Sequence, residues 1–525
     1  MLEKGYFVQS IEWRNQEMHL REVLLREARR NSRVDAFIYG DRRITFSQLK
    51  ERACRLANAL SSLGVGRGDR VGILLFNCLE YPEILWANFL LGSVAVTLNF
   101  RLVSEEIAYV QDVAELKVLI LGSGFLDRVD PVRDRLSGIE KFVCLGNEKS
   151  PGMVNYHELL EKGKAILPPV SGDDRDAAVV LFTSGTAAFP KAVVLTHHNL
   201  ITAGLIWAAD VGIQQGDNCL VVTPFYHIGA VGYHVAHAMC GASTTCFPQP
   251  NWDPELFLRT VEKEGITYLY ITPGMYRQVF AVPNFRKYDL RSWRVCITGS
   301  EPVPKATVEE MAENLPYGRI YNEYGLTEAA GPTVSVAKHE MAIAKAPSVG
   351  RPFINTDIRI MDESGQECEI GQVGEIAVKG DQVMKGYLND PETTAATLKD
   401  GWLYTGDLGK MDDEGFLYVV DRKKDIIISG GENISSVEVE SILYKHFKIM
   451  EAAVIGLPDP KFGEGVCAVV VPRKGERISE QEVVEFCKEH LAGFKKPRKV
   501  IFTDALPRNP SGKVLKRDLR KAYSG

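Results

Sequence analysis

The chain has 525 residues, of which 45% are hydrophobic and 25% are charged, so its composition is that of a globular protein too long for a single core. Its 62 Lys and Arg against 68 Asp and Glu give a formal net charge of -6. This balance excludes a global positive field that would attract nucleic acid or anionic lipid. Recognition of a ligand must therefore be local.

The ten cysteines are scattered, with no CxxC pair and no zinc-ligand spacing, which predicts reduced, buried thiols. Charges at Glu3, Lys4, Glu12 and Arg14 leave no continuous apolar segment at the N-terminus. The most apolar stretch, residues 84–100, contains polar residues and is too short to cross a bilayer, so we expect a buried helix leading into a strand. These features predict a cytoplasmic protein without a membrane span.

Apolar residues recur at alternating steps of four and three between residues 49 and 63, which predicts an amphipathic helix with its N-cap at Ser47 and its end at Gly64. Short apolar runs bounded by polar residues predict buried strands, and they lie at residues 71–76, 117–121, 177–182 and 266–271. Helical and strand patterns that alternate in this way predict an α/β fold with buried sheets.

The residue pattern of the sequence changes near residue 421, where the charged run Asp-Arg-Lys-Lys-Asp precedes a short strand pattern and a pair of glycines. The downstream patterns are a helix at 437–443, strands at 452–455 and 466–471, and a helix opened by a capping box between Ser479 and Glu482. We therefore expect a large N-terminal domain, residues 1–422, and a compact α+β C-terminal domain, residues 423–525.

The segment Thr183-Ser184-Gly185-Thr186-Ala187-Ala188-Phe189-Pro190-Lys191 follows a strand pattern and places small hydroxyl residues and a glycine before a lysine. Such loops cradle phosphates, which predicts a triphosphate site. A Walker A loop would end in Gly-Lys-Ser/Thr before a helix, whereas here Pro190 precedes the lysine and a strand pattern follows it. A plain Ser/Thr-rich turn is the alternative if the segment is taken alone.

Four further motifs follow in order: Tyr324-Gly325-Leu326-Thr327-Glu328, Tyr404-Thr405-Gly406-Asp407, Asp421-Arg422-Lys423-Lys424-Asp425 and Pro507-Arg508-Asn509-Pro510-Ser511-Gly512-Lys513. With the phosphate loop, these motifs resemble the adenylate-forming superfamily of acyl-CoA synthetases and nonribosomal adenylation domains. The resemblance covers essentially the whole chain. It implies a large N-terminal domain of parallel and mixed sheets flanked by helices, with a small mobile α+β C-terminal lid.

The resemblance implies that a carboxylate attacks the α-phosphate of magnesium-ATP, and that a thiol then displaces AMP. Two negatively charged reactants meet in the first half, so the site needs cations and backbone donors. Glu328 is implied to hold the magnesium, Thr327 to contact the α-phosphate, and Lys513 to stabilise the reacting groups. The implied ATP-binding residues are Thr183, Ser184, Gly185, Thr186, Lys191, Gly299, Ser300, Glu301, Pro302, Glu323, Tyr324, Gly325, Thr327, Asp407 and Arg422.

His227 is implied to lie where the acyl carboxylate meets the thiol, acting as a base or as a gate. The implied acyl pocket is apolar, with small residues at one wall, and contains Tyr226, His227, Gly229, Tyr233, Met275, Tyr276, Ala330 and Gly331. A medium-chain, alicyclic or aromatic acid would fit it. We expect the Glu323 side chain to point to solvent; if it entered the pocket, a polar or cationic acid such as a betaine would become plausible.

The resemblance also implies that the C-terminal domain rotates about Lys424 between the two half-reactions. Coenzyme A would then contact Gly430, Gly431, Glu432, Phe462, Phe494, Lys495 and Lys496. Relatives carry Thr-Gly at 187 and 188 and Gly at 192, so an alanine at a position that requires positive φ would strain this loop.

The predicted enzyme is an AMP-forming acid–CoA ligase that uses ATP, Mg²⁺ and coenzyme A, with no nucleic-acid partner. Two alternatives stay open: transfer of the acyl group to a carrier-protein pantetheine, and a nucleotide-binding regulator without catalysis. An oxygenase is compatible with the fold but has no sequence support of its own. The acid, the direction of the reaction in the cell, and a monomeric or homodimeric state do not follow from the sequence.

Overall fold

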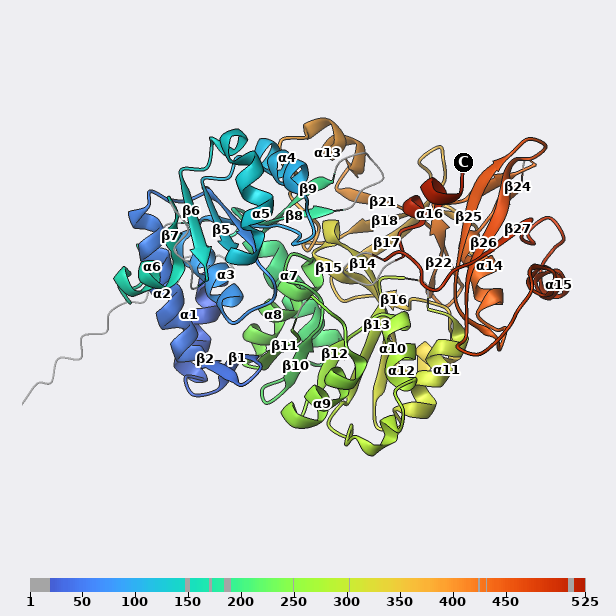
Figure 1. The fold of residues 1–525 in the computed structure, drawn as a ribbon, viewed down its shortest axis with the longest axis horizontal. Helices are drawn as coiled ribbons and strands as arrows, with labels where there is room; N and C mark the ends of the chain where they lie inside the picture. The colour runs from blue at the N-terminus through green and yellow to red at the C-terminus, as the bar shows by residue number, and fades with distance from the viewer. Residues whose placement is uncertain are drawn as a thin grey trace, which may run out of the picture.

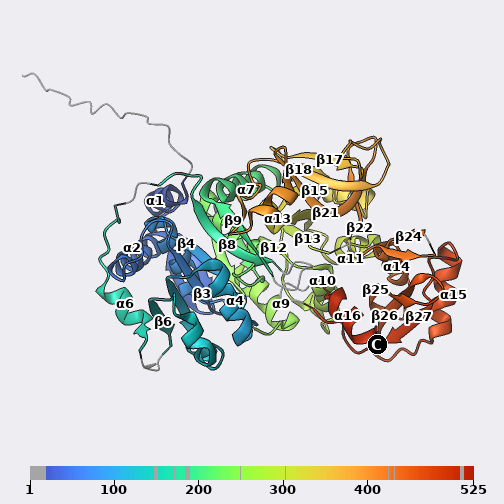
Figure 2. The same cartoon turned by 90° about the horizontal axis from the view of Figure 1, so that it is seen from above.

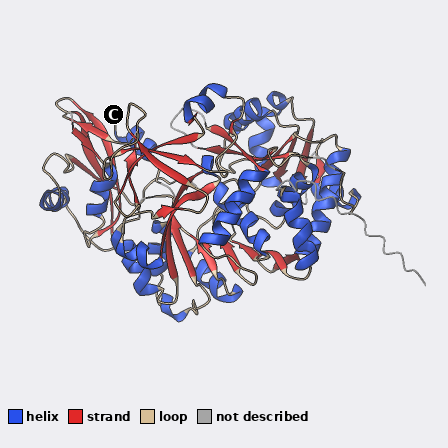
Figure 3. Ribbon diagram, turned by 180° about the vertical axis from the view of Figure 1, so that it is seen from behind, coloured by secondary structure: helices blue, strands red, loops and turns tan. Residues whose placement is uncertain are grey.

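The computed structural model describes residues 19–146, 152–169, 172–183, 190–248, 250–301, 303–423, 425–430, 432–508 and 514–524. Two large sheets and a third, smaller sheet form the body of the molecule, and a fourth sheet formed by the C-terminal residues lies at one end (Figures 1 and 2). Helices flank the sheets on several sides (Figure 3). The predicted fold class, a large α/β N-terminal part and a small α+β C-terminal part, is confirmed.

The first sheet is mostly parallel, with the antiparallel strands β9 and β19 at one edge. Among the described residues its strand order is β19 (Gly386–Tyr387), β9 (Lys191–Thr196), β8 (Ala177–Thr183), β4 (Val94–Thr97), β3 (Arg70–Leu74), β5 (Val118–Gly122), β6 (Lys141–Leu145) and β7 (Val154–Asn155).

The second sheet has a parallel centre and antiparallel strands at both edges. In the described part of the chain its order is β16 (Arg351–Pro352), β15 (Gly331–Lys338), β14 (Arg319–Leu326), β13 (Val295–Gly299), β12 (Tyr268–Tyr270), β10 (Asn218–Val221), β11 (Ser243–Cys246), β1 (Asp35–Tyr39) and β2 (Arg42–Thr45).

Two smaller sheets complete the fold. The third is antiparallel and contains β17 (Asp357–Met361), β18 (Gly374–Lys379), β21 (Trp402–Met411), β20 (Leu398–Lys399) and β22 (Leu417–Arg422). The fourth contains β24 (Glu432–Ile434), β23 (Ile427–Ser429), β26 (Gly463–Pro472), β25 (Ile449–Asp459) and β27 (Lys499–Phe502).

The main core combines one face of each large sheet with a layer of helices that supply its largest apolar side chains. These helices are α1 (Leu20–Arg30), α2 (Phe46–Ser62), α3 (Glu80–Leu91), α6 (Tyr156–Lys162), α7 (His197–Asp210) and α8 (Ile228–Cys240). Because α7 and α8 pack on the second sheet, they place their side chains beside the ends of its central strands.

The outer face of the second sheet carries a separate core with α9 (Pro254–Glu264), α10 (Pro273–Phe280), α11 (Lys305–Asn314) and α12 (His339–Ala344). The outer face of the first sheet is covered by α4 (Ser104–Ala114) and α5 (Leu126–Val129). Helix α13 (Pro391–Thr397) follows β19. The fourth sheet packs α14 (Ser436–Leu443) and α15 (Glu480–His490) on one face and α16 (Lys516–Tyr523) on the other.

The sequence predictions of individual elements are confirmed except at helix caps. The run at 84–100 is α3 followed by β4, and the other apolar runs form β3, β5, β8 and β12. Helix α2 begins two residues earlier than expected, because Thr45 and Gln48 form a reciprocal capping box and Ser47 is already helical. Ser479 does cap α15, but the side chain of Glu482 pairs with Lys448 at 2.7 Å.

None of the helices in the described ranges is both long and apolar enough to cross a bilayer.

Candidate active site

The predicted nucleotide residues gather where the parallel strands of the second sheet end. Gly299 ends β13, and the segment from Tyr324 to Glu328 runs through the end of β14 into a 3-10 turn at Thr327–Ala329. Carboxyl ends of parallel strands are where α/β sheets bind ligands. Gly299 has φ +154°, and a Cβ there would lie 2.2 Å from the carbonyl oxygen of Glu323, so the approach of β13 to β14 requires a glycine.

Tyr324, Asp407 and Arg422 form one connected group. The Tyr324 hydroxyl donates to Asp407 Oδ2 at 2.7 Å, and Arg422 Nε lies 3.1 Å from Asp407 Oδ1. Asp407 on β21 and Arg422 on β22 are paired in register, so the third sheet supplies the ion pair and the second sheet the ring. The carboxylate keeps lone pairs beyond these two contacts, and an aromatic ring stands beside it. An adenosine needs both features.

A second group joins the phosphate-loop lysine to the predicted metal ligand. The Tyr387 hydroxyl donates to Glu328 Oε1 at 2.9 Å, and Lys191 Nζ lies 4.8 Å from the centre of the Tyr387 ring. Strand β19 holds Tyr387 opposite Val193 of β9, while Met384 N donates to the Glu328 carbonyl at 2.7 Å. Sequence reasoning missed Tyr387, since a single Gly-Tyr pair far from both partners carries no spacing signal.

The two strands that flank the predicted phosphate loop are antiparallel, with Thr183 opposite Lys191 and the Thr183 hydroxyl donating to the Lys191 carbonyl at 3.4 Å. A strand therefore follows the loop, which confirms that it is not a Walker A loop. Ser184, Gly185, Thr186, Ala187 and Ala188 lie outside the described residues.

The condition for strain, a positive φ, is not met at residue 192. Ala192 is a buried strand residue paired with Phe182, its backbone does not adopt positive φ, and its carbonyl accepts from Leu388 N at 2.8 Å. A glycine at this position would gain no conformational advantage, because the strand conformation suits any side chain.

Glu301 links the end of β13 to the C-terminal part of the chain. Its Oε2 lies 3.2 Å from Arg508 Nη1, and its Oε1 accepts from Gly274 N at 3.3 Å. Arg508 also pairs with Glu451 on β25 and forms a β-bridge with Val514. The two ends of the segment that carries Lys513 are thus joined to each other and held against the wall of the site, while Pro302 and Lys513 themselves lie outside the described residues.

Ser300, next to Glu301, has φ +62°, a conformation that costs free energy in a non-glycine residue and is typical of functional loops. Its hydroxyl accepts from the Tyr270 hydroxyl at 2.5 Å. The loop that follows β13 is therefore hydrogen-bonded to a side chain of β12.

His227 caps the N-terminus of α8. Its Nδ1 accepts from Gly229 N at 3.1 Å, so a neutral imidazole in this position keeps its hydrogen on Nε2. Nδ1 of His227 is therefore already used by the N-terminus of the helix.

The face of α8 below His227 carries Gly229, Tyr233 and His237 at steps of four residues. Tyr233 stacks on Trp207 of α7 with ring centres 4.2 Å apart. A Cβ added at Gly331 would lie 3.5 Å from the Trp207 ring, and Ala330 is buried beside it. Four of the predicted acyl residues thus share this region, and Trp207 is a member that sequence reasoning missed.

Three other predicted acyl residues lie apart. Tyr276 and Met275 belong to the core on the outer face of the second sheet, and the Tyr276 hydroxyl donates to the Ile297 carbonyl at 3.1 Å. Tyr226 is buried in the core of the first sheet, 5.3 Å from the ring of Phe100. Tyr276 therefore packs on the face of the second sheet opposite to the face that Tyr233 contacts.

The expectation that Glu323 points to solvent is wrong. Its side chain is 1% exposed, and it accepts from the Tyr233 hydroxyl at 2.9 Å. Burial raises the pKa of its carboxyl to about 8, and the bond from Tyr233 opposes this shift only in part. Glu323 thus extends toward α8, away from the Tyr324–Asp407 pair with which it was grouped.

Some of the predicted coenzyme A residues also come together. Gly430 donates its N–H to the Phe462 carbonyl at 2.8 Å, and the Arg498 guanidinium lies 3.7 Å from the centre of the Phe462 ring. Lys495 instead pairs with Glu438 at 2.7 Å, and Phe494 is 40% exposed. Glu432 and Lys496 are exposed and half-buried respectively, and Gly431 lies outside the described residues.

The predicted hinge, Lys424, also lies outside the described residues, but its neighbours form a turn. The Arg422 carbonyl accepts from Asp425 N at 2.8 Å and Ile426 N at 3.2 Å, and Lys423 pairs with Glu375 at 3.3 Å. The last strand of the third sheet ends at Arg422, and the first strand of the fourth begins at Ile427.

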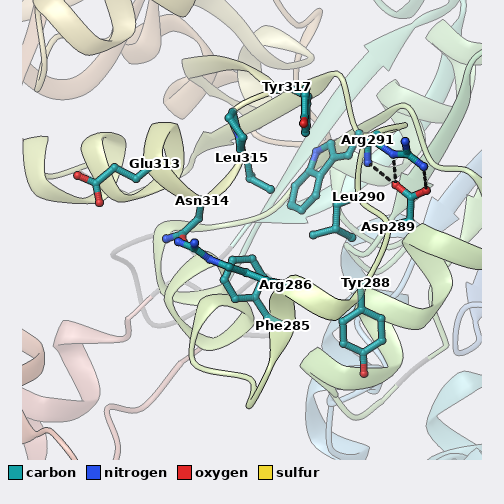
Figure 4. A pocket seen from close by; sticks show the side chains of 13 residues that line it. Phe285, Arg286, Tyr288, Asp289, Leu290, Arg291, Glu313, Asn314, Leu315 and Tyr317 are labelled. Atoms are coloured by element: carbon teal, nitrogen blue, oxygen red, sulfur yellow. Dashed lines mark hydrogen bonds and ion pairs between the residues drawn. The ribbon is translucent and has the colours of Figure 1, made fainter.

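A surface pocket of about 320 Å³ lies elsewhere, at the amino ends of β13 and β14 (Figure 4). Aromatic residues such as Phe285 and Tyr317 line it, and the ion pair between Asp289 and Arg291 lies at its rim (Figure 4). None of the predicted site residues is among its lining residues, and it lies at the edge of the sheet opposite to the site described above.

Comparison with known families identifies this arrangement. Residues 24–388 match the model of the AMP-binding enzymes, and residues 438–513 match that of the AMP-binding enzyme C-terminal domain. The chain belongs to the AMP-binding enzymes. The adenylate-forming resemblance found in the sequence is confirmed, as is the class of AMP-forming acyl-CoA synthetases.

The relatives of this AMP-binding enzyme act on different acids. A long-chain-fatty-acid–CoA ligase of Mycobacterium tuberculosis is 35% identical over 508 residues, covering 96% of this chain and 98% of that protein. A feruloyl-CoA synthase of Amycolatopsis is 36% identical over 511 residues, covering 95% and 98%.

Solved structures agree in fold. An anthranilate CoA ligase in complex with anthranoyl-AMP has a TM-score of 0.91 at 26% identity, covering 96% of this chain and 97% of that one. The O-succinylbenzoate coenzyme A synthetase of Bacillus subtilis, in complex with ATP and magnesium, has a TM-score of 0.83 at 32% identity, covering 95% and 99%.

Proposed function

We propose that the protein activates a medium-chain, alicyclic or aromatic carboxylic acid through an acyl-adenylate to its coenzyme A thioester, releasing AMP and pyrophosphate. One observation carries this proposal. The short segment from Tyr324 to Glu328 connects two groups, the Tyr324–Asp407–Arg422 cluster and the Lys191–Tyr387–Glu328 cluster. Spaced in this way, the first can hold an adenosine while the second faces its phosphates.

In the first half-reaction a carboxylate oxygen of the acid forms a bond to the α-phosphorus of ATP, and the bond from that phosphorus to pyrophosphate breaks. Both reactants are anions, so positive charge must lie around the phosphates. Lys191 supplies one cation at the mouth of the phosphate loop, and Arg422 supplies another beside the ribose position. Lys513 would add a third between the carboxylate and the α-phosphate.

Glu328 fits a magnesium site, because a carboxylate oriented by the Tyr387 hydroxyl is the hard oxygen ligand that this ion prefers. When bound, Mg²⁺ would neutralise charge on the phosphates. Thr327, in the turn before Glu328, would contact the α-phosphate.

In the second half-reaction the sulfur of coenzyme A forms a bond to the acyl carbon, the bond from that carbon to AMP breaks, and the thiol proton passes to solvent. In this scheme His227 does not take the thiol proton, because Nδ1 already accepts from Gly229 N and a neutral ring then carries its hydrogen on Nε2. This favours a positioning role over that of a base.

The C-terminal residues, 423–525, act as a lid that moves about Lys424 relative to residues 1–422. The Phe462–Arg498 stack next to Gly430 supports a coenzyme A contact on this lid, because an aromatic ring with a guanidinium suits an adenine beside a phosphate. The acid is held against the α8 face with Tyr233 and Trp207, near Ala330 and Gly331. Relatives named for a fatty acid and for ferulate support an apolar or aromatic tail.

The test is AMP release from ATP, magnesium and coenzyme A over acids from acetate through hexanoate, cyclohexanecarboxylate and benzoate to palmitate, with free thiol measured in parallel. We expect AMP and thiol loss in equal amounts for a group of medium-sized acids. Asp407→Asn should raise the KM for ATP at least about tenfold, by weakening charge-assisted bonds. Asp413→Asn, at an exposed carboxylate near the turn between β21 and β22, is the matched control. AMP release that does not depend on an acid, or that leaves the thiol intact, would overturn the proposal.

A further inference from the structure

The strongest unexplained feature near the site is the carboxyl of Glu323. It is 1% exposed and accepts from the Tyr233 hydroxyl through Oε2 at 2.9 Å. Its other oxygen, Oε1, is buried and has no hydrogen-bond partner within the described chain. Leaving a buried polar atom unpaired costs free energy, so such atoms in a binding region point to a missing partner.

The register of the sheet shows what surrounds this carboxyl. Tyr270 on β12 lies level with Ile297 and Tyr321, so Tyr268, Tyr270 and Glu323 all project from the face of the sheet that α8 covers. Tyr233 of α8 lies among them, with its ring centre 5.9 Å from that of Tyr270 and 6.0 Å from that of Tyr268. No lysine or arginine in the described ranges forms an ion pair with Glu323.

Two more buried polar groups in this cluster lack partners among the described residues: the Tyr268 hydroxyl and Nε2 of His237. His237 stacks at 6.2 Å on Tyr233 and lies edge-on to Tyr268 at 5.7 Å. The cluster therefore lines a continuous stretch of α8, from Gly229 through Tyr233 to His237.

The hydrogen bonds of His237 fix which of its nitrogens carries the proton. The Trp86 indole N–H donates to Nε2 of His234, so neutral His234 must donate from Nδ1 to the Thr244 hydroxyl at 3.1 Å. The Thr244 hydroxyl then donates to Nδ1 of His237, also at 3.1 Å. Burial lowers the pKa of both histidines, so His237 is neutral and its unpaired Nε2 carries a hydrogen.

Glu323 also offers a hydrogen at neutral pH, since burial raises its pKa to about 8 and its Oε2 already accepts from Tyr233. The unpaired groups of the cluster are therefore donors: Glu323 Oε1–H, His237 Nε2–H and the Tyr268 hydroxyl. A substrate ammonium ion would face the N–H of His237 and would require Glu323 to lose its proton, and an alkyl tail would leave all three groups unpaired. An uncharged oxygen is the group that accepts from them.

We propose that Glu323 selects carboxylic acids whose tail carries an uncharged oxygen, a hydroxyl or a keto group, near its far end. This inference rests on the proposed function, because it assigns the tail of the same acid to the α8 face. Glu323 is then a specificity-determining residue, which holds the tail oxygen while His227 orients the carboxylate at the mouth of the site.

Helix geometry gives the length of such an acid. Tyr233 follows His227 by six residues, which corresponds to about 9 Å along α8 at about 1.5 Å per residue. An extended carbon chain advances about 1.25 Å per bond, from a C–C length of about 1.5 Å, so about seven bonds span this distance. A six-carbon acid with a terminal oxygen matches it.

The experiment compares isosteric acids in the AMP-release assay: heptanoate with a terminal methyl, 6-hydroxyhexanoate with a hydroxyl and 6-aminohexanoate with an ammonium. The same three tails are also tested on chains two carbons shorter and two carbons longer. We expect kcat/KM for the hydroxy acid to exceed that for the methyl acid by about tenfold at the best length, mostly through KM. This preference should weaken as the pH rises through about 8, because Glu323 then loses the hydrogen that it donates.

Two variants separate recognition from packing. Glu323→Gln keeps a buried donor and acceptor without the charge, so it should retain the preference for the hydroxy acid. Glu323→Leu should lose the preference for the hydroxy acid, and thermal denaturation reports separately whether the variant is folded. If the leucine variant does not fold, the wild-type series and the glutamine variant decide alone.

The outcomes distinguish the selectivity assigned to Glu323 from the ligase activity itself. If the methyl acid were activated as well as the hydroxy acid at every chain length, the role of Glu323 would be overturned, and the proposed ligase activity would stand. A preference for 6-aminohexanoate that disappears in Glu323→Gln would show that the site selects a cationic tail. This result would also overturn the proposed selection for an uncharged oxygen. No AMP release with any acid of the wider panel would instead refute the proposed function.

Discussion

The hydroxyl of Tyr387 offers a sharp test of the phosphate end of the site. Replacing Tyr387 by Phe removes the bond to Glu328 Oε1, which is 2.9 Å long, and keeps the ring that faces Lys191. Tyr387 is 8% exposed, so solvent would not readily replace the lost donor. Glu328 would then keep its charge but lose the group that holds its orientation.

The size of the effect follows from the kind of bond. A hydrogen bond to a charged group contributes about 1.5–3 kcal/mol. Because Glu328 is partly exposed, the lower end applies, about 1.5 kcal/mol, which corresponds to about a tenfold change in binding. We therefore expect the magnesium concentration for half-maximal adenylation to rise about tenfold in Tyr387→Phe.

The assay is acid-dependent pyrophosphate release at fixed ATP over a magnesium titration. Tyr387→Leu removes the ring as well, so the KM for ATP should rise a further few-fold through the loss of the Lys191 contact. Tyr418→Phe, which removes a tyrosine–carboxylate bond of 3.3 Å to Asp412 on the same domain, is the matched control. A Phe variant with the magnesium dependence of the wild type would refute the role of the hydroxyl.

Three further predictions concern other contacts. Glu301→Gln, which weakens the pair with Arg508 at 3.2 Å, should slow adenylation several-fold and leave thioester formation from a preformed acyl-adenylate unchanged; equal slowing of both would contradict it. Lys513→Ala should depress adenylation by about 10²–10³ and spare thioester formation, measured in the same two assays. His227→Asn keeps an N-cap acceptor for α8, so this variant should unfold at the same temperature as the wild type while its acyl transfer is slower. His227→Ala should slow acyl transfer and also lose about 1 kcal/mol of stability, measured by thermal denaturation. Normal acyl transfer in the Asn variant would exclude the imidazole from the reaction.

The elements of the fold could be predicted because their signals are local. Apolar runs of five or six residues specify buried strands such as β3 and β5, and the spacing of leucines specifies α2. The start of α2 was predicted two residues too late, because Ser47 has a side chain that suits an N-cap but the cap is Thr45. The reciprocal bonds between Thr45 and Gln48 decide between them, and a side-chain pair of that kind is visible only in the structure.

Members of the candidate site were predicted where they share one motif and missed where the fold brings them together. Tyr324 and Glu328 stand in one five-residue motif, whereas Tyr387 is 59 residues from Glu328, and Trp207 reaches the acyl region from a different helix. Motif order indicates which residues belong to a family's chemistry. It contains no information on which side chains from distant strands complete the site.

Glu323 shows a different limit. The side chains of successive strand residues point to opposite faces of a sheet. Because the Tyr324 side chain points toward Asp407, the carboxyl of Glu323 points toward α8. The expectation of a solvent-facing glutamate rested on the ordinary cost of burying an acid. At this position the cost is reduced by the Tyr233 hydroxyl and by retention of a proton, neither of which a single sequence reveals.

Several polar contacts cross the predicted hinge, and the proposed domain movement would have to break them. Asp421, before Lys424, accepts from both N and Oγ of Ser436 at 2.6 and 2.8 Å, and Arg508 pairs with Glu301. A rotation about Lys424 that separates α14 from β22 has to break the first contact, and one that withdraws Lys513 has to break the second. Each involves polar groups that water can satisfy once they are exposed, so each contributes about 1–3 kcal/mol rather than the larger cost of opening an apolar core. The bond from Ser435 Oγ to the Val420 carbonyl at 2.8 Å and the Arg277 guanidinium, 4.8 Å from the centre of the Tyr444 ring, add to these two contacts. Ligands would replace this arrangement only if they bind the alternative one more tightly by at least the free energy of these contacts.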